Sequence, residues 1–134
     1  MKTKSALVRD YMAKHLVAFA PDMDVLDAIH QLVQHRIAGA PVVDERGDLV
    51  GMLSEFDCMK VALNAGYFSQ RGGPVAEFMS TEVETVDAAM SIVDLAQKFL
   101  DSKYRRFPVM NDNRLVGQIS RRDVLRALQV LSAG

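Results

Sequence analysis

The chain of 134 residues has room for one ordinary domain, and its 49% apolar and 25% charged residues are the balance of a soluble globular protein, not of a disordered one. Sixteen basic against seventeen acidic side chains leave a formal charge of −1, which disfavours a protein that wraps nucleic acid. No apolar run approaches the ~18 residues of a membrane span, and no hydrophobic signal core follows Met1. The single cysteine, Cys58, cannot form an internal disulfide, so we expect a reducing cytoplasm.

The first predicted helix follows a short amphipathic turn over residues 7–14 and an extended stretch over residues 16–19. Asp24 and Asp27 have the spacing of a capped helix start, with aspartate in place of the usual glutamate. Apolar residues then recur at helical spacing and predict one buried face. They are Val25, Ile29, Leu32 and Val33.

A β-hairpin and another helix are predicted next. Residues 40–43 and 49–53 form the two strands, joined by a turn that contains Gly47. The second helix runs from Ser54 toward Asn64. Glycine and proline in residues 66–74 then predict a linker.

The second half of the chain repeats the first. Residues 8–12 (VRDYM) recur 67 positions later as residues 75–79 (VAEFM). After a hairpin turn that is one residue shorter, the offset becomes 66 and pairs Ser54 with Ser120. The second copy therefore has the same predicted elements: an extended stretch over residues 83–86, a helix capped by Ser91 with the apolar stripe Ile92, Leu95, Phe99 and Leu100, a hairpin of residues 107–110 and 115–119, and a helix from Ser120 toward Leu131.

Each copy is a β-α-β-β-α unit of about 60 residues, so the predicted fold class is α+β (mixed α/β), with two pseudo-symmetric repeats packed as one module. The predicted boundaries are residues 1–65 for the first repeat, 66–74 for the linker and 75–134 for the second repeat. A unit this small has too little core to be comfortable alone. We therefore expect the copies to bury their sheets and helices against each other, with a pocket at the seam.

The most specific repeated feature is Gly-hydrophobic-hydrophobic-Ser-x-x-Asp at the end of each hairpin, at residues 51–57 and 117–123. The serine and the aspartate suit the N-cap and N3 positions of the helix that follows. They also suit a ligand, because a helix N-terminus offers N–H groups to an anion and an aspartate can accept from both hydroxyls of a ribose. The two roles are compatible at one place.

The Val-x-[Asp/Glu]-aromatic-Met turn, the x-Pro-Val-hydrophobic strand and the Gly-x-x-Ser-x-x-Asp motif together resemble the cystathionine β-synthase (CBS) domain, over roughly residues 8–65 and 75–132. Two copies in tandem resemble a Bateman module. The resemblance implies one pseudo-symmetric body that commonly dimerises. It also implies clefts that bind AMP, ADP, ATP or S-adenosylmethionine and regulate a partner. Because the match leaves no room for a catalytic domain, we expect no enzyme activity and no catalytic cofactor.

The resemblance further implies two composite clefts, each with the Ser-x-x-Asp motif of one copy and the first strand and pre-Pro-Val residues of the other. The family favours a threonine on that first strand, which Thr85 supplies and Ala18 does not. The first cleft would join Ser54 and Asp57 to Thr85, Lys103, Arg105, Arg106 and Phe107. The second would join Ser120, Arg121, Arg122 and Asp123 to Ala18, Arg36, Gly39 and Ala40.

Charge is distributed unevenly between the copies. Residues 103–126 hold seven basic side chains against two acidic ones, a balance of +5, whereas residues 36–60 hold three basic against five acidic ones, a balance of −2. Arginine and lysine that converge on a pocket suit phosphate oxygens, and each charged hydrogen bond contributes roughly 1.5–3 kcal/mol. The alternatives are a solvated basic surface, or salt bridges to the acidic residues between Glu77 and Asp101.

Metal and nucleophile chemistry are disfavoured. His30 and His35 are five residues apart, which is not the spacing of two ligands on one helical face. Cys58 has no histidine near it in sequence and is expected to be a packed thiol. The serines lack a base at a recognisable spacing.

The leading hypothesis is therefore a stand-alone regulatory module, expected to be a homodimer, that senses an adenine nucleotide and signals its occupancy to an unknown partner. A dimerisation or partner-docking module with degenerate, ligand-free clefts is the alternative, and Ala18 favours it. Nucleic-acid binding through the basic segment is a third reading, which predicts affinity that falls steeply with salt. Neither nucleic acid nor a membrane is the expected partner.

Overall fold

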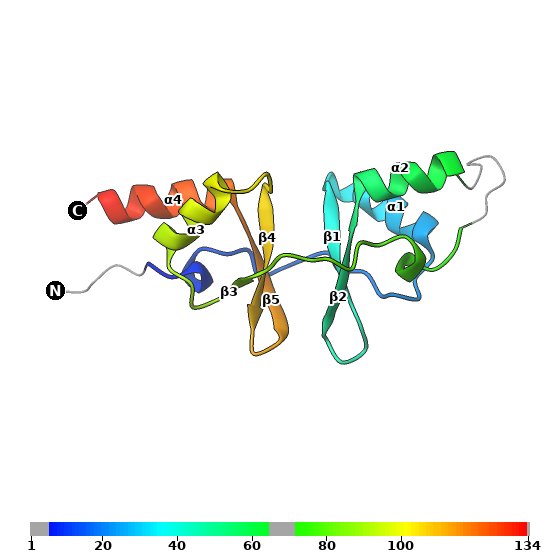
Figure 1. The fold of residues 1–134 in the computed structure, drawn as a ribbon, viewed down its shortest axis with the longest axis horizontal. Coiled ribbons are helices and arrows are strands. Elements are labelled where there is room, and N and C mark those ends of the chain that lie inside the picture. The colour runs from blue at the N-terminus through cyan, green and yellow to red at the C-terminus, as the bar shows by residue number, and fades with distance from the viewer. Residues whose placement is uncertain (1–5, 65–71, 134) are drawn as a thin grey trace. The chain divides into compact units, whose positions relative to one another are not determined.

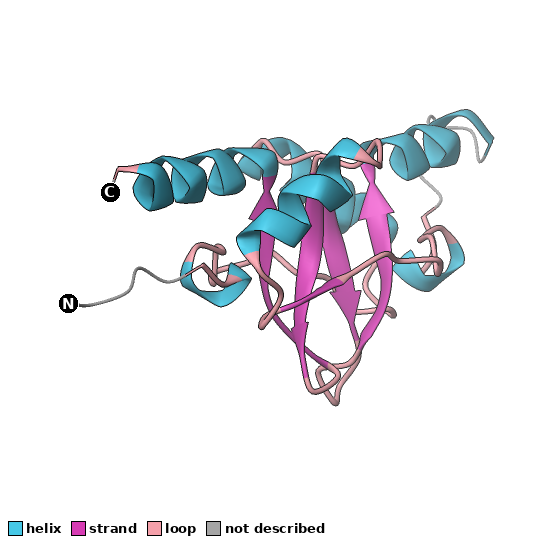
Figure 2. Ribbon diagram, turned by 60° about the vertical axis from the view of Figure 1, so that its left-hand side comes forward, coloured by secondary structure: helices cyan, strands magenta, loops and turns pink. Residues whose placement is uncertain are grey.

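The computed structural model describes residues 6–64 and 72–133 as two compact units (Figure 1). One unit is Val17–Val83, and the other combines Met1–Leu16 with Glu84–Gly134. Figure 2 shows that each unit contains strands and helices. Each unit is described by itself below.

The unit of residues 17–83 is built on a hairpin between two helices. The helix α1 (Val25–His35) leads to β1 (Gly39–Val43) and β2 (Leu49–Ser54), and α2 (Glu55–Asn64) follows directly. The strands pair antiparallel, with Gly39 opposite Ser54. Phe19 adds a single parallel bridge to Val42, because its N–H donates to the carbonyl of Pro41 at 3.0 Å.

The other unit has the same plan with a third strand. Its elements are β3 (Val86–Asp87), α3 (Ile92–Leu100), β4 (Arg106–Asn111), β5 (Arg114–Ser120) and α4 (Arg121–Ser132). The sheet order is β3-β4-β5, parallel between β3 and β4 and antiparallel between β4 and β5. Of the extended stretch expected at residues 16–19, only Phe19 forms a bridge. Of the stretch expected at residues 83–86, only Val86 lies in a strand, the two-residue β3.

The predicted helix caps are confirmed. The Asp24 carboxylate accepts from the N–H of Leu26 at 2.9 Å, and the Ser91 hydroxyl accepts from the N–H of Asp94 at 3.0 Å. The end of α1 is set by Arg36, which adopts a left-handed conformation with φ 56°.

The expectation that Val33 and Leu100 lie on the buried helix faces is wrong. Val33 is 72% exposed and Leu100 is 80% exposed. At 100° per residue, Val33 lies about 80° around α1 from Val25, at the margin of an apolar stripe. Val25 and Leu32 do lie in the core.

The leading segment of each repeat packs on the other repeat. The short 3-10 helix Val8–Asp10 lies in the unit of the second repeat, where the N–H of Val8 donates to the carbonyl of Met90 at 2.9 Å. The equivalent 3-10 helix, Val75–Glu77, lies in the unit of the first repeat, where the N–H of Val75 donates to the carbonyl of Met23 at 2.8 Å. In Figure 1 the blue segment accordingly lies beside the yellow-to-red elements.

Both leading segments contribute to a core. Val8 and Val75 are fully buried, and burial of a valine side chain stabilises a fold by about 1.5–3 kcal/mol. The compact units are therefore bounded at residues 16/17 and 83/84, and not at the linker predicted for residues 66–74. Residues 66–71 of that linker lie outside the described residues. The predicted boundaries of the repeats describe the sequence repeat and stay a prediction.

The glycines of the repeated motif make room for these leading segments. A Cβ atom on Gly117 would lie 2.6 Å from the carbonyl oxygen of Ala13, and one on Gly51 would lie 2.8 Å from that of Ser80. Ala13 and Gln118 exchange backbone hydrogen bonds of 2.8 and 2.9 Å across this contact. Only glycine lets the two backbones come so close.

Within residues 6–64 and 72–133, every helix is too short or too polar to traverse a lipid bilayer.

Candidate functional site

Ser54 and Asp57 form a reciprocal pair at the start of α2. The Asp57 Oδ2 atom accepts from the backbone N–H of Ser54 at 3.0 Å and from its hydroxyl at 2.9 Å. The N–H of Asp57 donates back to the Ser54 hydroxyl oxygen at 3.1 Å. The pair caps the helix and holds the carboxylate half-buried at its N-terminus, where the helix dipole favours negative charge.

Ser120 and Asp123 form the same capping box at the start of α4. The N–H of Ser120 donates to Asp123 Oδ2 at 2.9 Å, and the N–H of Asp123 donates to the Ser120 hydroxyl at 3.2 Å. Capping accounts for the serine and aspartate of both motifs. Because the Oδ2 atom makes the cap in each case, the Oδ1 atom is the one that a ligand hydroxyl could reach.

The residues before each Pro-Val strand lie beside the motif of their own repeat. Gly39 is opposite Ser54, and the N–H of Glu55 donates to the carbonyl of Ala38 at 2.8 Å. Arg106 is opposite Ser120 in the other unit. The predicted clefts combine these groups across repeats: Ser54 and Asp57 lie in one unit, and Thr85, Lys103, Arg105, Arg106 and Phe107 lie in the other. The composition of both clefts stays a prediction.

Two predicted site residues belong to the cores. Ala40 is 1% exposed and Phe107 is fully buried. Their side chains face other core residues, so only their backbone atoms could contact a ligand. Thr85 is half-buried, whereas Ala18 and Arg36 are exposed.

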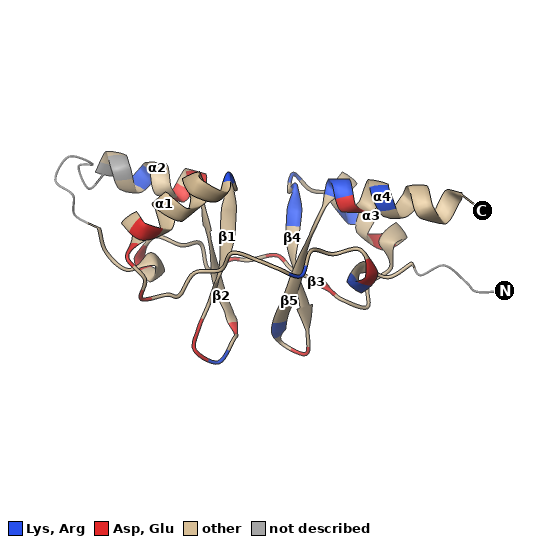
Figure 3. Cartoon of the chain, turned by 180° about the vertical axis from the view of Figure 1, so that it is seen from behind, with Lys and Arg blue, Asp and Glu red and all other residues tan. Residues whose placement is uncertain are grey.

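The basic residues of the second repeat gather at the starts of β4 and α4, where Figure 3 shows blue segments. Arg121 is anchored there, because its Nε–H donates to the carbonyl of Tyr104 at 3.1 Å and its backbone N–H donates to the carbonyl of Arg105 at 3.1 Å. The side chains without a hydrogen bond or ion pair to other described residues are Lys103, Arg105, Arg106 and Arg122.

Acidic residues do not neutralise this basic cluster within the described residues. The ion pairs found there are Lys98–Glu84 at 2.9 Å and Arg126–Asp123 at 3.2 Å. Neither pair includes a basic residue between 103 and 122. The predicted alternative of salt bridges between the basic segment and residues 77–101 is therefore wrong for the described residues. The side chains of Lys103, Arg105 and Arg122 are exposed and available to an anion.

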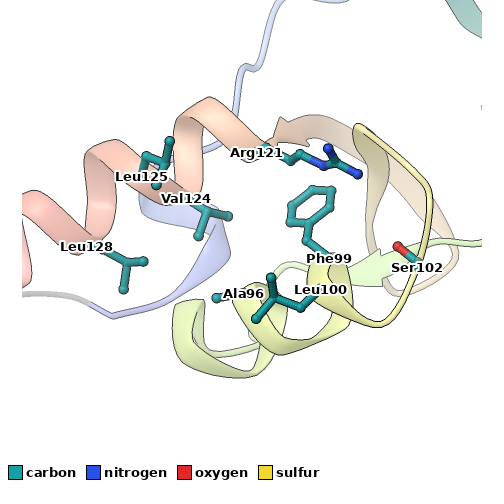
Figure 4. A pocket seen from close by; sticks show the side chains of 8 residues that line it. All are labelled: Ala96, Phe99, Leu100, Ser102, Arg121, Val124, Leu125 and Leu128. Atoms are coloured by element: carbon teal, nitrogen blue, oxygen red, sulfur yellow. The ribbon is translucent and has the colours of Figure 1, made fainter.

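An apolar hollow of about 450 Å³ lies between α3 and α4 (Figure 4). Of the predicted site residues it contains only Arg121. Its lining offers one guanidinium and no carboxylate, which does not match a nucleotide. The hollow was not predicted, although apolar residues that prove exposed, such as Leu100 and Leu125, were the signal for it. Its lining residues are Ala96, Phe99, Leu100, Ser102, Arg121, Val124, Leu125 and Leu128.

A second hollow, of about 640 Å³, lies at the hairpin turn of the unit of residues 17–83. Asp22, Asp44 and Glu45 line it together with Arg46. This excess of carboxylates repels phosphate, so the hollow is a poor nucleotide site. Among the residues described by the structure, no three histidine, cysteine or acidic side chains are grouped as metal ligands.

Cys58 is a buried thiol with a raised pKa. Burial, followed by the charges of Asp57 and Glu55, raises the pKa of this thiol from 9.0 to about 11. Because the thiolate is the reactive form, we expect a thiol reagent such as DTNB to label the native chain at pH 8 at least ~100-fold more slowly than the unfolded chain. The rate should rise as the pH approaches 11. Equal labelling rates before and after unfolding would show that Cys58 is accessible and ionised.

The family model described as the CBS domain matches this chain twice, over residues 8–64 and 75–130. A similar protein is the CBS domain-containing protein YhcV of Bacillus subtilis. It is 32% identical over 117 residues, which cover 87% of this chain and 81% of that protein.

Two solved structures of similar fold contain adenosyl ligands. The crystal structure of CBSX2 (a CBS-pair protein from Arabidopsis thaliana) in complex with AMP has a TM-score of 0.80 and 31% identity, and covers 94% of this chain and 98% of that chain. The CBS domain pair of MJ0100, in complex with methylthioadenosine and S-adenosylmethionine, has a TM-score of 0.72 and 26% identity, and covers 92% and 96%. These similarities confirm the predicted mixed α+β fold class.

Proposed function

Because the chain belongs to the CBS-domain family, we propose that it is a regulatory module that binds an adenine nucleotide (AMP, ADP, ATP) or a related adenosyl ligand and signals occupancy to a partner protein. The observation that carries this proposal is the pair of carboxylates held at the starts of α2 and α4, by Ser54 with Asp57 and by Ser120 with Asp123. The related structures with AMP and with adenosyl compounds support it.

The acidic and the basic candidate site residues suit different parts of a nucleotide. A carboxylate at a helix start accepts from the two ribose hydroxyls, as charge-assisted hydrogen bonds. The exposed guanidinium and ammonium groups of Arg105, Arg122 and Lys103 suit phosphate oxygens. The proposal keeps the two predicted composite clefts. In one of them Lys103 and Arg105 would serve the ligand that Asp57 binds, and in the other Arg122 would serve the ligand that Asp123 binds.

Signalling would follow from population shift. A ligand that contacts both repeats favours the arrangement in which its affinity is highest, and a partner that binds this arrangement better reads the occupancy. No catalytic step is part of this mechanism.

Thermal unfolding with and without nucleotide tests the proposal. AMP, ADP or ATP at ~100 times its dissociation constant should stabilise the fold by about 2.7 kcal/mol, a rise in melting temperature of roughly 2–8 °C for a chain of this size. Asp57→Ala and Asp123→Ala should each reduce the ligand-induced rise, measured against the variant's own ligand-free melting temperature. A panel of adenine nucleotides that produces no rise at millimolar concentration would refute the proposal.

Asp94→Ala is the matched control for this experiment. Asp94 occupies the N3 position of α3, with its N–H donating to Ser91, and it is not a predicted site residue. Its replacement removes an acidic residue from a helix start, as the other two substitutions do. The nucleotide-induced rise should therefore stay at the wild-type value.

Homodimerisation or docking of a partner protein is the second candidate function. The apolar hollow of α3 and α4 favours it, because Leu100 and Leu125 are 80% and 67% exposed there. A dimer in sedimentation that forms equally with and without every nucleotide, combined with no nucleotide binding, would favour this function over the first.

A further inference from the structure

The two ribose-binding candidates differ in how their carboxylates are occupied. In the described residues, Asp57 makes its hydrogen bonds through Oδ2, and its Oδ1 has no protein partner. Asp123 uses Oδ2 in the same way, but its Oδ1 accepts from Nη1 of Arg126 at 3.2 Å. The atom that a ribose hydroxyl would use is open in one motif and occupied in the other.

Arg126 is held beside Asp123 by a second anchor. Its Nη2 donates to the carbonyl oxygen of Tyr11 at 2.9 Å, in the leading segment that packs on this unit. The Arg126 side chain is 56% exposed and that of Asp123 is 17% exposed. The guanidinium thus bridges two acceptors at the surface, where a ligand could displace it.

Among its described residues, the first repeat has no such bridge. Lys60 occupies the equivalent position, three residues after Asp57. Its ammonium group lies over the ring of Phe56, 4.7 Å from the centroid, and forms no ion pair with the Asp57 carboxylate. Lysine and arginine are not equivalent here, because only the guanidinium fork reaches two acceptors at once.

We propose that Arg126 makes the two sites unequal: nucleotide fills the Asp57 motif first, and fills the Asp123 motif only by displacing Arg126 from Oδ1. This inference rests on the proposed function. Exposed ion pairs are weak, so the displacement should lower affinity at the Asp123 motif by about 3- to 10-fold, which corresponds to about 0.7–1.4 kcal/mol. Ala18, which stands where the family favours threonine, would also lower affinity at the Asp123 motif, but this effect is independent of Arg126.

Calorimetric titration of the full chain with AMP tests the inference. The wild type should show a tight and a weak class of sites. Asp57→Ala should leave only the weak class, and Asp123→Ala only the tight class. Arg126→Ala should strengthen the weak class by about 3- to 10-fold, since it frees Oδ1 while the capping box stays intact. Arg126→Gln keeps most of the side-chain length and should act in the same direction.

Lys60→Ala is the matched control and should leave both classes unchanged. A weaker Asp123 site in Arg126→Ala would show that Arg126 contacts the ligand, and would overturn the inference. An unchanged weak class, or equal affinities in Asp57→Ala and Asp123→Ala, would overturn it as well. Absence of binding by AMP, ADP, ATP and S-adenosylmethionine alike to the wild type overturns the proposed function together with this inference, whereas the preceding outcomes overturn the inference alone.

Discussion

Replacing Phe107 by alanine should lower the free energy of unfolding of its unit by about 3–5 kcal/mol. The side chain is fully buried, and its ring lies 4.8 Å from that of Phe99 and 5.4 Å from that of Tyr104 between centroids. Alanine would remove these contacts and leave a cavity in the core. Urea denaturation followed by circular dichroism measures the loss.

Phe107→Leu is the control, with an expected loss of about 1 kcal/mol, because leucine keeps most of the buried apolar volume. The first repeat has Ala40 at the corresponding position, so the large side chain is needed only in the second repeat. A loss below 1 kcal/mol for Phe107→Ala would show that the ring is not part of a packed core.

Gly117→Ala should destabilise the contact between the leading segment and β5 by about 1–3 kcal/mol, as overpacking against a backbone does. The added Cβ would lie 2.6 Å from the Ala13 carbonyl oxygen and 2.7 Å from Met12 Sδ. The methionine side chain can turn away, but the carbonyl cannot move without breaking the paired hydrogen bonds of Ala13 and Gln118. The gain from a stiffer unfolded chain is smaller than this loss.

Amide hydrogen exchange at Ala13 and Gln118 is the specific readout for Gly117→Ala. Both amides should exchange faster, because their mutual hydrogen bonds open with the segment. Gln118→Ala changes the neighbouring side chain while leaving the backbone pair intact, so its stability should stay within about 0.5 kcal/mol of wild type. Unchanged exchange at Ala13 in Gly117→Ala would mean that the close approach is not required.

Local signals in the sequence predicted most elements correctly. Helix caps at Asp24, Ser91 and Ser120 depend on side chains next to the backbone groups that they satisfy, so their spacing is readable. Hairpins are equally local, because the turn fixes the pairing of strands that follow each other directly. Because the repeat presents each element twice, each copy supports the elements predicted in the other.

Non-local features could not be predicted in this way. The leading segments, with Val8 and Val75, are so alike that nothing in their residues says which repeat each one packs on. The glycines at 51 and 117 read as part of a ligand motif, yet their structural task is to let a distant backbone approach. Arg126 bonds to Tyr11, which is 115 residues away, and no spacing rule covers such a contact.

The capping role was predicted for Asp57 and Asp123, but the unequal occupation of their Oδ1 atoms was not. That difference depends on the side chain three positions after each aspartate. Arg126 bonds to the Asp123 carboxylate, whereas Lys60 lies over the ring of Phe56. Arg121 likewise resembled a phosphate ligand in sequence, but its guanidinium holds the carbonyl of Tyr104. Side-chain partners of long basic residues are set by the folded surface, not by local sequence.

A crystal structure of the full chain grown with millimolar AMP tests the central claim most directly. The account predicts AMP bound with its ribose hydroxyls donating to the carboxylate of Asp57, and phosphate density near exposed basic side chains of the second repeat. An ordered structure in which neither Asp57 nor Asp123 contacts a nucleotide at that concentration would contradict it.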